Sequence, residues 1–275
     1  MHGKNPYRPI KTEVLNVITE TPTIKTLRLK PAEPISFRTG QFIELTVPGA
    51  GEGPFTPSSR PAVKDELEVT IMRVGKVTEK IHQLKKGDTV GVRGPFGAGY
   101  PLDEFKGKEI LVVGGGCGFA PLRSLMYSLF DMSGEFKQLF FRGGCKTSKE
   151  FLYREEIESW TKRKDLNMKL TVDRADDDKT WKHNVGLVTT ILDKLDMDCK
   201  KGLAIVCGPP IMMKFATFKL IDLGFQENNI FLSMEKNMSC GIGKCGHCRI
   251  GTYYACKDGP VFQYSKIKKF AEIWE

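Results

Sequence analysis

Short apolar runs broken by glycine and proline mark the first hundred residues. They fall at 24–29, 42–47, 67–73 and 89–92. Apolar and polar positions alternate within these runs, which at this spacing predicts the strands of a small antiparallel barrel. Residues 78–84 interrupt the pattern and predict one short helix. The amino-terminal part of the chain is therefore expected to fold as a β-barrel.

From about residue 108 the pattern changes to an alternation of strands and helices. The predicted strands are 109–113, 138–142, 168–172 and 203–207, and the predicted helices are 121–130, 149–160, 187–195 and 211–223. Such alternation indicates a parallel sheet covered by helices. After Phe231 the pattern gives way to a Gly- and Cys-rich tail, which is too small to fold without a metal centre. We expect a barrel domain at 1–102, an α/β domain at 103–232 and a metal-binding lobe at 233–275.

Length and charge narrow the class of protein. A chain of 275 residues with 40% hydrophobic content can form two compact domains and a small appendage. The net charge of +9 is spread along the chain without a nucleic-acid motif, so we expect no nucleic-acid partner. The charge suits an acidic protein partner or a phosphorylated cofactor. The chain lacks both an apolar run of about 18 residues and a signal-peptide pattern, which predicts a cytoplasmic protein without a membrane span.

Four of the eight cysteines crowd together near the carboxyl end, as Cys240-x4-Cys245-x2-Cys248-x7-Cys256. The C-x4-C-x2-C spacing is typical of a [2Fe–2S] loop, and the intervening glycines allow backbone to wrap closely around the sulfides. A structural zinc site is the alternative, although only Cys245 and Cys248 have the C-x2-C spacing of a zinc knuckle. A redox thiol site is a third interpretation. His247 lies between two ligands and is interpreted as their neighbour, because four thiolates already complete the site.

Two glycine-containing loops follow predicted strands of the α/β domain. The first runs from a buried strand into a helix that opens with Pro121, and it predicts a dinucleotide site at Gly115, Gly116, Cys117, Gly118 and Pro121. The second comprises Cys207, Gly208, Pro209 and Pro210. Because ligands bind at the carboxyl ends of strands in such sheets, the two loops are expected to face each other. Each loop taken alone is also compatible with an ordinary turn.

The order of motifs along the whole chain resembles the ferredoxin–NADP reductase superfamily, in which a flavin barrel precedes a nicotinamide domain. The residues that carry the resemblance are 40–42, 54–59, 73–78, 114–122, 171–173, 207–210, 240–249 and 256–260. Within the superfamily the chain is most similar to gamma subunits of Ni–Fe sulfhydrogenases and to one of the subunits of anaerobic sulfite reductases. The resemblance implies FAD in the barrel domain, NAD(P) in the α/β domain and a [2Fe–2S] cluster in the lobe.

The resemblance also implies roles in flavin binding. Phe55 would pack near the isoalloxazine and Thr56 would bond near flavin N5. Arg73 would lie near the FAD phosphates, with backbone N–H groups of Gly75, Val77 and Thr78 on the pyrophosphate. The other implied contacts are Pro54, Ser58, Ser59, Ile71 and Met72. Many members of the superfamily have an arginine where this chain has Gly53, so the flavin phosphate would be anchored elsewhere, at Arg73 or Arg60.

Further residues of the α/β domain are candidates for the nicotinamide cofactor. Asp173 falls in the stretch that leads towards the nicotinamide pocket in the family, and it could equally cap a loop. Arg142 and Lys146, with Ser148, could hold a 2′-phosphate, although a solvated face explains the same residues, so NAD and NADP remain open. Cys207 could lie beside the nicotinamide or be a small buried residue.

The expected activity is hydride transfer between nicotinamide C4 and flavin N5, followed by single-electron steps through the cluster to a partner. No acid–base side chain is needed, which agrees with the presence of only four histidines. The expected partners are iron–sulfur and hydrogenase subunits of a heteromeric complex. An anaerobic sulfite reductase complex with a sirohaem subunit is the alternative. A zinc-stabilised nucleotide-binding regulator is the non-enzyme alternative.

Overall fold

The computed structural model describes residues 5–175, 180–193 and 195–274, which form two compact units. The first unit contains the chain up to Tyr100 together with residues 123–128 and 235–261. The second contains residues 101–122 and 129–234 and the chain from Phe262 onward. The tail predicted as one lobe, 233–275, is thus divided between the units. Among the described residues, no helix has the length and apolar character needed to span a membrane.

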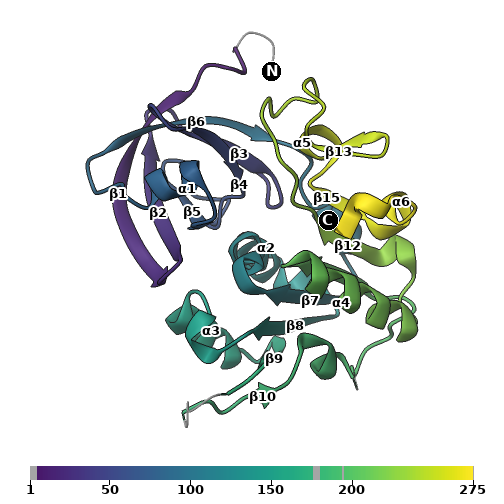
Figure 1. Ribbon diagram of the computed structural model, residues 1–275. Coiled ribbons are helices and arrows are strands. Elements are labelled where there is room, and N and C mark those ends of the chain that lie inside the picture. The colour runs from purple at the N-terminus through teal and green to yellow at the C-terminus, as the bar shows by residue number, and fades with distance from the viewer. Residues whose placement is uncertain (1–4, 176–179, 194, 275) are drawn as a thin grey trace. The chain divides into compact units, whose positions relative to one another are not determined.

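The first unit is built on a six-stranded antiparallel sheet that curls around a single core (Figure 1). The strand order is β4-β3-β6-β1-β2-β5. The strands are β1 (Ile10–Thr21), β2 (Ile24–Pro31), β3 (Phe42–Val47), β4 (Gly51–Phe55), β5 (Leu67–Met72) and β6 (Thr89–Phe96). Pro57, just after β4, forms an isolated bridge to Val69 of β5, which brings the two edge strands together. The predicted barrel is therefore confirmed, and the predicted short helix is α1 (Lys76–Ile81).

Strand β3 shows how the barrel obtains two buried faces. Ile43, Leu45 and Val47 belong to the barrel core. Because successive side chains of a strand point to opposite faces, Phe42 and Glu44 project from the outer face. Both are nonetheless buried, at 2% and 0% exposure. Something outside the six strands must therefore cover this part of the barrel.

The second unit contains a seven-stranded sheet in the order β10-β9-β8-β7-β11-β12-β15. Its strands are β7 (Glu109–Gly115), β8 (Gln138–Cys145), β9 (Leu166–Val172), β10 (Asn184–Val185), β11 (Leu203–Cys207), β12 (Ile230–Ser233) and β15 (Val261–Gln263). The pairs from β10 through to β12 are parallel. From β7 the chain adds β8, β9 and β10 on one side and then β11 on the other. The order of strands thus reverses between β7 and β11.

The helices of this unit agree with the predicted pattern in three places and differ in one. Helices α2 (Phe119–Asp131), α3 (Arg154–Thr161) and α4 (Pro210–Asp222) are present, with α3 packed against β9 and α4 against β11 (Figure 1). Helix α3 begins five residues later than expected, after a separate 3-10 turn at Ser148–Glu150. The helix predicted at 187–195 is wrong, since the described residues of this stretch, 187–193 and 195, form only a 3-10 turn at Val188–Leu192. Four consecutive β-branched residues in that turn, Val188, Thr189, Thr190 and Ile191, disfavour a longer helix.

The cysteine-rich segment adds small elements to the first unit. A two-stranded ribbon joins β13 (Arg249–Ile250) to β14 (Tyr253–Tyr254), and α5 (Ala255–Asp258) follows it directly. Beyond β15, helix α6 (Tyr264–Ile267) belongs to the second unit. The regular pattern therefore continues beyond Phe231, where the sequence predicted its end, because short buried strands such as β12 carry little periodicity.

Candidate functional site

The two glycine-containing loops of the second unit lie side by side at the reversal point of the sheet. Strand β7 ends at Gly115 and pairs with β11 so that Gly114 is opposite Cys207. In open parallel sheets this point, at the carboxyl ends of the strands, is where ligands bind. The expectation that the loops face each other is confirmed. We refer to Gly115–Gly118 together with Cys207–Pro210 as the glycine edge.

The backbones of the glycine edge touch directly. A Cβ atom on Gly118 would lie 2.5 Å from the Cys207 carbonyl oxygen and 2.7 Å from Gly208 Cα. Only glycine fits a gap of this width, since the neighbouring atoms are main chain and cannot move aside. Gly118 precedes α2, which begins at Phe119, so the edge places helix amide groups beside the strand ends. Pro121 lies inside the helix rather than opening it, two residues later than Phe119.

Two further predicted residues reach the same end of the sheet. Lys146 follows β8 directly and Asp173 follows β9 directly, and both side chains are exposed. The Asp173 amide donates to the Cys145 carbonyl, and the Arg174 amide donates to the Lys146 carbonyl. These bonds extend the parallel pairing past the strand ends and hold Lys146 and Asp173 beside each other. Cys207 itself is 3% exposed, as the small-residue interpretation requires.

Arg142 does not fit the predicted 2′-phosphate role. It lies in the middle of β8, at 1% exposure, and its guanidinium donates to the carbonyls of Ile191, Phe141 and Asn167. A fourth bond goes to the side-chain oxygen of Asn167. Burial lowers its pKa from the usual 12.5 to about 10. The guanidinium therefore joins the strand to the 3-10 turn after β10, and Lys146 remains as the exposed basic residue of the predicted pair.

In the first unit, the predicted flavin stretch begins at the end of β4. Pro54 and Phe55 are half-buried and pair with Glu44 and Ile43 of β3. Phe55 packs against the barrel core, and Thr56 is the first residue after β4. Phe55 is thus held by a strand, which is the rigid support that a planar ring needs, and Thr56 follows it directly.

Ser58 and Ser59 have internal partners. The Ser58 hydroxyl is completely buried and lies 3.2 Å from the Thr70 hydroxyl. The Ser59 hydroxyl accepts the Glu68 amide at 3.1 Å. Both serines thus tie the segment after β4 onto β5. This geometry argues against the predicted cofactor contact for the Ser58 side chain.

The segment after β5 is exposed and closes onto itself through Thr78. Ile71 is buried in the core, whereas Met72 and Arg73 are exposed. The Thr78 hydroxyl accepts the amides of Val74 and Gly75 at 2.9 Å and donates to the Gly75 carbonyl. The Gly75 amide is therefore engaged within the chain, contrary to its predicted role as a phosphate donor. Arg73 and Val77 remain candidates.

The four clustered cysteines come together on one loop, Ser239–Cys256, which we call the cysteine loop. Cys240 Sγ accepts backbone amides from Ile242, Lys244 and Cys245 at 3.3–3.5 Å. Burial raises the pKa of the Cys240 thiol, but these donors outweigh it and lower the value to about 6. A sulfur surrounded by amide donors is stabilised as thiolate, which is the form that binds metal.

The other cysteines of the loop complete two pairs. Cys248 Sγ lies 3.2 Å from Cys256 Sγ, and Cys256 Sγ accepts the Gly243 amide at 3.0 Å. The Cys245 side chain is the hydrogen-bond partner of Cys240. Burial, with Cys248 next to it, raises the pKa of Cys256, so metal binding would displace a proton there. The described residues contain no group of three or more His, Cys, Asp or Glu side chains close enough for a bare metal ion.

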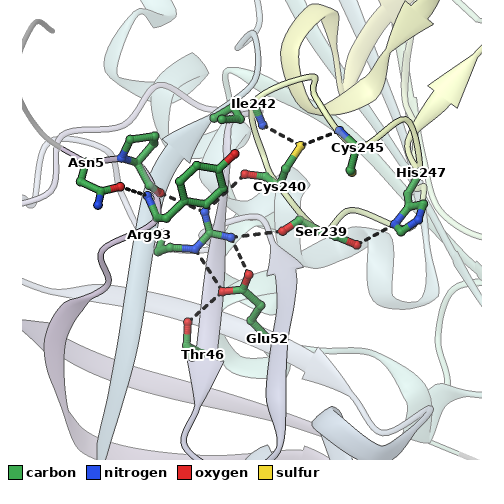
Figure 2. A network of polar contacts seen from close by, with 11 residues as sticks. Asn5, Thr46, Glu52, Arg93, Ser239, Cys240, Ile242, Cys245 and His247 are labelled. Atoms are coloured by element: carbon green, nitrogen blue, oxygen red, sulfur yellow. Dashed lines mark hydrogen bonds and ion pairs between the residues drawn. The ribbon is translucent and has the colours of Figure 1, made fainter.

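These sulfur contacts fit a thiolate-bound inorganic cluster. Two pairs of sulfurs, with amide donors at Cys240 and Cys256, match the thiolate donor set of an iron–sulfur cluster. Gly241 has a φ of +73°, and a Cβ atom there would lie 2.8 Å from the Phe96 ring of β6. The loop thus needs glycine both for its torsion and for its close approach to the barrel. The His247 ring is hydrogen-bonded through Nδ1 to the Ser239 hydroxyl at 2.8 Å (Figure 2).

The cysteine loop covers the outer face of the barrel at β3, β4 and β6. Four side chains of this face, Glu44, Thr46, Glu52 and Arg93, form what we call the polar platform. Cross-strand pairing sets Glu44 opposite Arg93 and Thr46 opposite Glu52. The Thr46 hydroxyl donates to Glu52 at 3.0 Å, and Arg93 forms an ion pair with Glu52 at 2.6 Å (Figure 2).

Glu44 is the unusual member of the polar platform. Both of its carboxylate oxygens are buried, with no hydrogen-bond partner among the described residues. Burial raises its pKa from 4.5 to about 8, with the charge of Glu52 acting in the same direction against the opposing charge of Arg93. A buried carboxyl group of this kind holds its proton at neutral pH, because the ionised form would be poorly solvated. Glu44 is therefore neutral over most of the physiological range.

Sequence patterns did not identify the polar platform. The only available signals were a lone acid inside the apolar run 42–47 and an arginine directly after Val92 of a predicted strand. Both would normally indicate solvent-facing positions of a barrel. Their burial depends on the cysteine loop, whose Cys240 follows Arg93 by 147 residues and lies still farther from Glu44, and no local pattern reports such a contact.

Comparison with known protein families assigns each part of the chain to a class. Residues 11–100 match an oxidoreductase FAD-binding domain, and residues 112–217 match an oxidoreductase NAD-binding domain. Residues 235–268 match the iron–sulfur cluster binding domain of dihydroorotate dehydrogenase B. The three matches follow the order expected from the sequence.

Named relatives extend the similarity over nearly the whole chain. Sulfhydrogenase 1 subunit gamma of Pyrococcus furiosus is 38% identical, with 97% of this chain and 94% of that protein covered. A Methanocaldococcus jannaschii protein is 32% identical over 97% of this chain and 94% of its own, and is named "Probable dihydroorotate dehydrogenase B (NAD(+)), electron transfer subunit". Both values are high enough to establish a common family.

Solved structures share the fold. A structure described as an NADH-dependent reduced ferredoxin–NADP oxidoreductase, studied for flavin-based electron bifurcation, has a TM-score of 0.74 and 24% sequence identity. The match covers 98% of this chain and 94% of that one. The barrel and the parallel sheet are thus the two folds of a known architecture.

Proposed function

Because the chain belongs to the ferredoxin–NADP reductase-like family of FAD- and NAD-binding oxidoreductases, we propose that it is an electron-transfer subunit of a multi-subunit redox complex. In this function it passes electrons between NAD(P)H and a partner subunit by way of FAD and an iron–sulfur cluster. The observation that carries the proposal is the cysteine loop, where amide donors surround two pairs of thiols. When bound, the flavin supplies the exchange between two-electron and one-electron chemistry.

Each segment has a proposed task. In the barrel, residues 1–102, we propose that Phe55 and Thr56 orient the flavin ring and that the loop at Arg73 and Val77 holds its phosphates. In residues 103–232, the glycine edge with Lys146 and Asp173 holds the nicotinamide cofactor. Residues 233–275 carry the cluster. Support comes from the strand that fixes Phe55 and from the packed backbones of the glycine edge.

The cluster is proposed to be [2Fe–2S], bound by Cys240, Cys245, Cys248 and Cys256. The pairing supports this type, because Cys240 lies with Cys245 and Cys248 lies with Cys256, so that each pair can hold one iron. Thiolate ligands also need a reducing environment, which supports a cytoplasmic location. A single zinc ion is the competing occupant.

A hydrogenase complex is the proposed partner, supported by the 38% identity to a sulfhydrogenase gamma subunit. A dihydroorotate dehydrogenase B complex is the second candidate, favoured by the cluster-domain match and the Methanocaldococcus relative. Copurification of the native complex separates them. Nickel would support the hydrogenase, dihydroorotate oxidation would support the second candidate, and sirohaem absorbance would support a sulfite reductase.

Spectroscopy of the purified chain tests the cofactors. We expect flavin absorbance and, after reduction, the electron paramagnetic resonance signal of one [2Fe–2S] cluster. Cys245→Ser should abolish the cluster signal while NAD(P)H still bleaches the flavin, because the ligand is lost but the flavin and nucleotide segments remain. Cys199→Ser, which changes a cysteine of the second unit, is the matched control and should leave both signals intact. A colourless protein containing zinc would overturn the proposal.

A further inference from the structure

Arg93 of β6 uses its guanidinium to join three separate segments of the first unit. Nε and Nη2 donate to the two carboxylate oxygens of Glu52, at 3.0 and 2.6 Å. Nη1 donates to the Pro6 carbonyl at 3.0 Å and to the Cys240 carbonyl at 3.3 Å. Nη2 also donates to the Ser239 carbonyl at 3.3 Å (Figure 2). One side chain thus connects β4, the amino-terminal segment and the start of the cysteine loop.

The cost of burying this charge indicates that it has a specific task. Arg93 is 3% exposed, and a buried ion pair contributes little net stability compared with apolar residues of the same volume. Its planar fork, however, can bind a carboxylate through two bonds and still direct donors at three carbonyls. A lysine at the same position has neither the geometry nor the number of fixed donors.

The contacts of Arg93 with the cysteine loop identify the part of the loop that it positions. The two loop carbonyls belong to Ser239 and Cys240, and Cys240 is the residue whose sulfur receives three backbone amides. Immediately afterwards, Gly241 lies against the Phe96 ring, whose centroid is 5.5 Å from the Arg93 guanidinium carbon. The guanidinium and the ring therefore hold the entry to the cysteine loop from two sides.

We propose that Arg93 is the positioning residue of the iron–sulfur site, with Glu52 as the counter-charge that orients it. This inference rests on the proposed function, because it assigns a role towards the cluster. Arg93 fixes the Cys240 main chain, and so the direction of its sulfur, on the outer face of the barrel. Its positive charge also lies next to the first ligand, where it favours the reduced cluster, which carries one more negative charge.

The two charges predict opposite shifts of the cluster's reduction potential. Arg93→Met removes a positive charge and the carbonyl donors, so the iron content per flavin should fall several-fold and any remaining cluster should have a more negative potential. Glu52→Gln removes a negative charge but keeps an acceptor for the guanidinium, so iron should be retained and the potential should become more positive. Arg93→Lys keeps the charge without the fork and should give intermediate iron content with a potential near that of the wild type.

The barrel offers a matched control. Arg28 also pairs with a glutamate, Glu66, but its side chain is 51% exposed and its ion pair lies between β2 and the segment just before β5. Arg28→Met should leave iron content and potential unchanged. Flavin content and thermal unfolding show whether each full-length variant is folded. If Arg93→Met does not fold, the reduction potential of the cluster in Glu52→Gln decides the test.

The outcomes separate this inference from the proposed function. A wild-type chain without iron overturns the proposed function. A wild-type chain with its cluster, combined with Arg93→Met of equal iron content and potential, overturns only the role of Arg93. An unchanged potential in Glu52→Gln overturns the assignment of the charge pair. A merely structural role would lower stability without moving the potential in opposite directions.

Discussion

The glycine edge and the cysteine loop both depend on glycine, but they obtain their shapes from different sources. At the glycine edge, neighbouring strands β7 and β11 bring two backbones into contact, and Gly118 fits against Cys207. In the cysteine loop, the arginine that fixes Cys240 precedes it by 147 residues. The first site is therefore a product of sheet topology, whereas the second is held by side chains from another structural element.

This difference indicates which kind of substitution should disrupt each site. Within the glycine edge, Gly118 and Gly208 have no space for an added Cβ atom, so the weakness of this site is steric and is felt in the second unit. The cysteine loop rests on the polar platform, which contains charged groups in a buried place. Its weakness is electrostatic, and its properties should depend on pH. The glycine edge should show no such dependence.

The largest expected effect concerns Glu44. Its folded pKa of about 8 lies above the unfolded value of 4.5, so the native state holds a proton that the unfolded state releases as the pH rises. Stability should therefore fall between pH 4.5 and 8, by at most about 1.4 kcal/mol per pH unit and up to about 5 kcal/mol in total. Glu44→Gln should remove this slope, as measured by urea unfolding across this range of pH. Equal slopes in both proteins would contradict the electrostatic account of the platform.

A steric effect at the glycine edge should be next in size. Gly118→Ala would place a Cβ atom 2.5 Å from the Cys207 carbonyl, and overpacking of this kind costs about 3 kcal/mol. We expect a lower free energy of unfolding and weaker NAD(P)H binding, with the cluster signal unchanged. Gly134→Ala is the control, because a Cβ atom added at Gly134 would have no atom of the described residues within 4 Å. Similar losses in both variants would remove the distinction between the two sites.

The smallest expected effect is the difference between two glycine substitutions in the cysteine loop. It separates the cost of a positive φ from the cost of a steric contact with the barrel. Gly241 and Gly246 both have positive φ, at +73° and +85°, so alanine at either position costs about 1–2 kcal/mol of backbone strain. Only Gly241 also meets the Phe96 ring, which should add about 1 kcal/mol in Gly241→Ala. Iron content per flavin should therefore fall further in Gly241→Ala than in Gly246→Ala. If the two variants retain equal iron, the contact with the barrel is unimportant.

Local patterns predicted the parts of the fold that local physics determines. The strand at 203–207 is present with those bounds, because five consecutive apolar residues between glycines can form little else. The cysteine spacing likewise predicted a loop with four thiols close together. The short helix at 187–195 failed because its apolar positions are satisfied by packing a 3-10 turn against β8 and β9.

The sequence by itself therefore determined the barrel, the parallel sheet, the two facing loops and the clustering of four cysteines, since each depends on periodicity or on spacing within one segment. Only the tertiary structure decided the roles of Arg142, Arg93 and Glu44. An isolated charge in a strand looks the same whether it faces water or a covering loop. The distinction arises from burial, which changes the solvation of the charge and depends on segments far away in the chain.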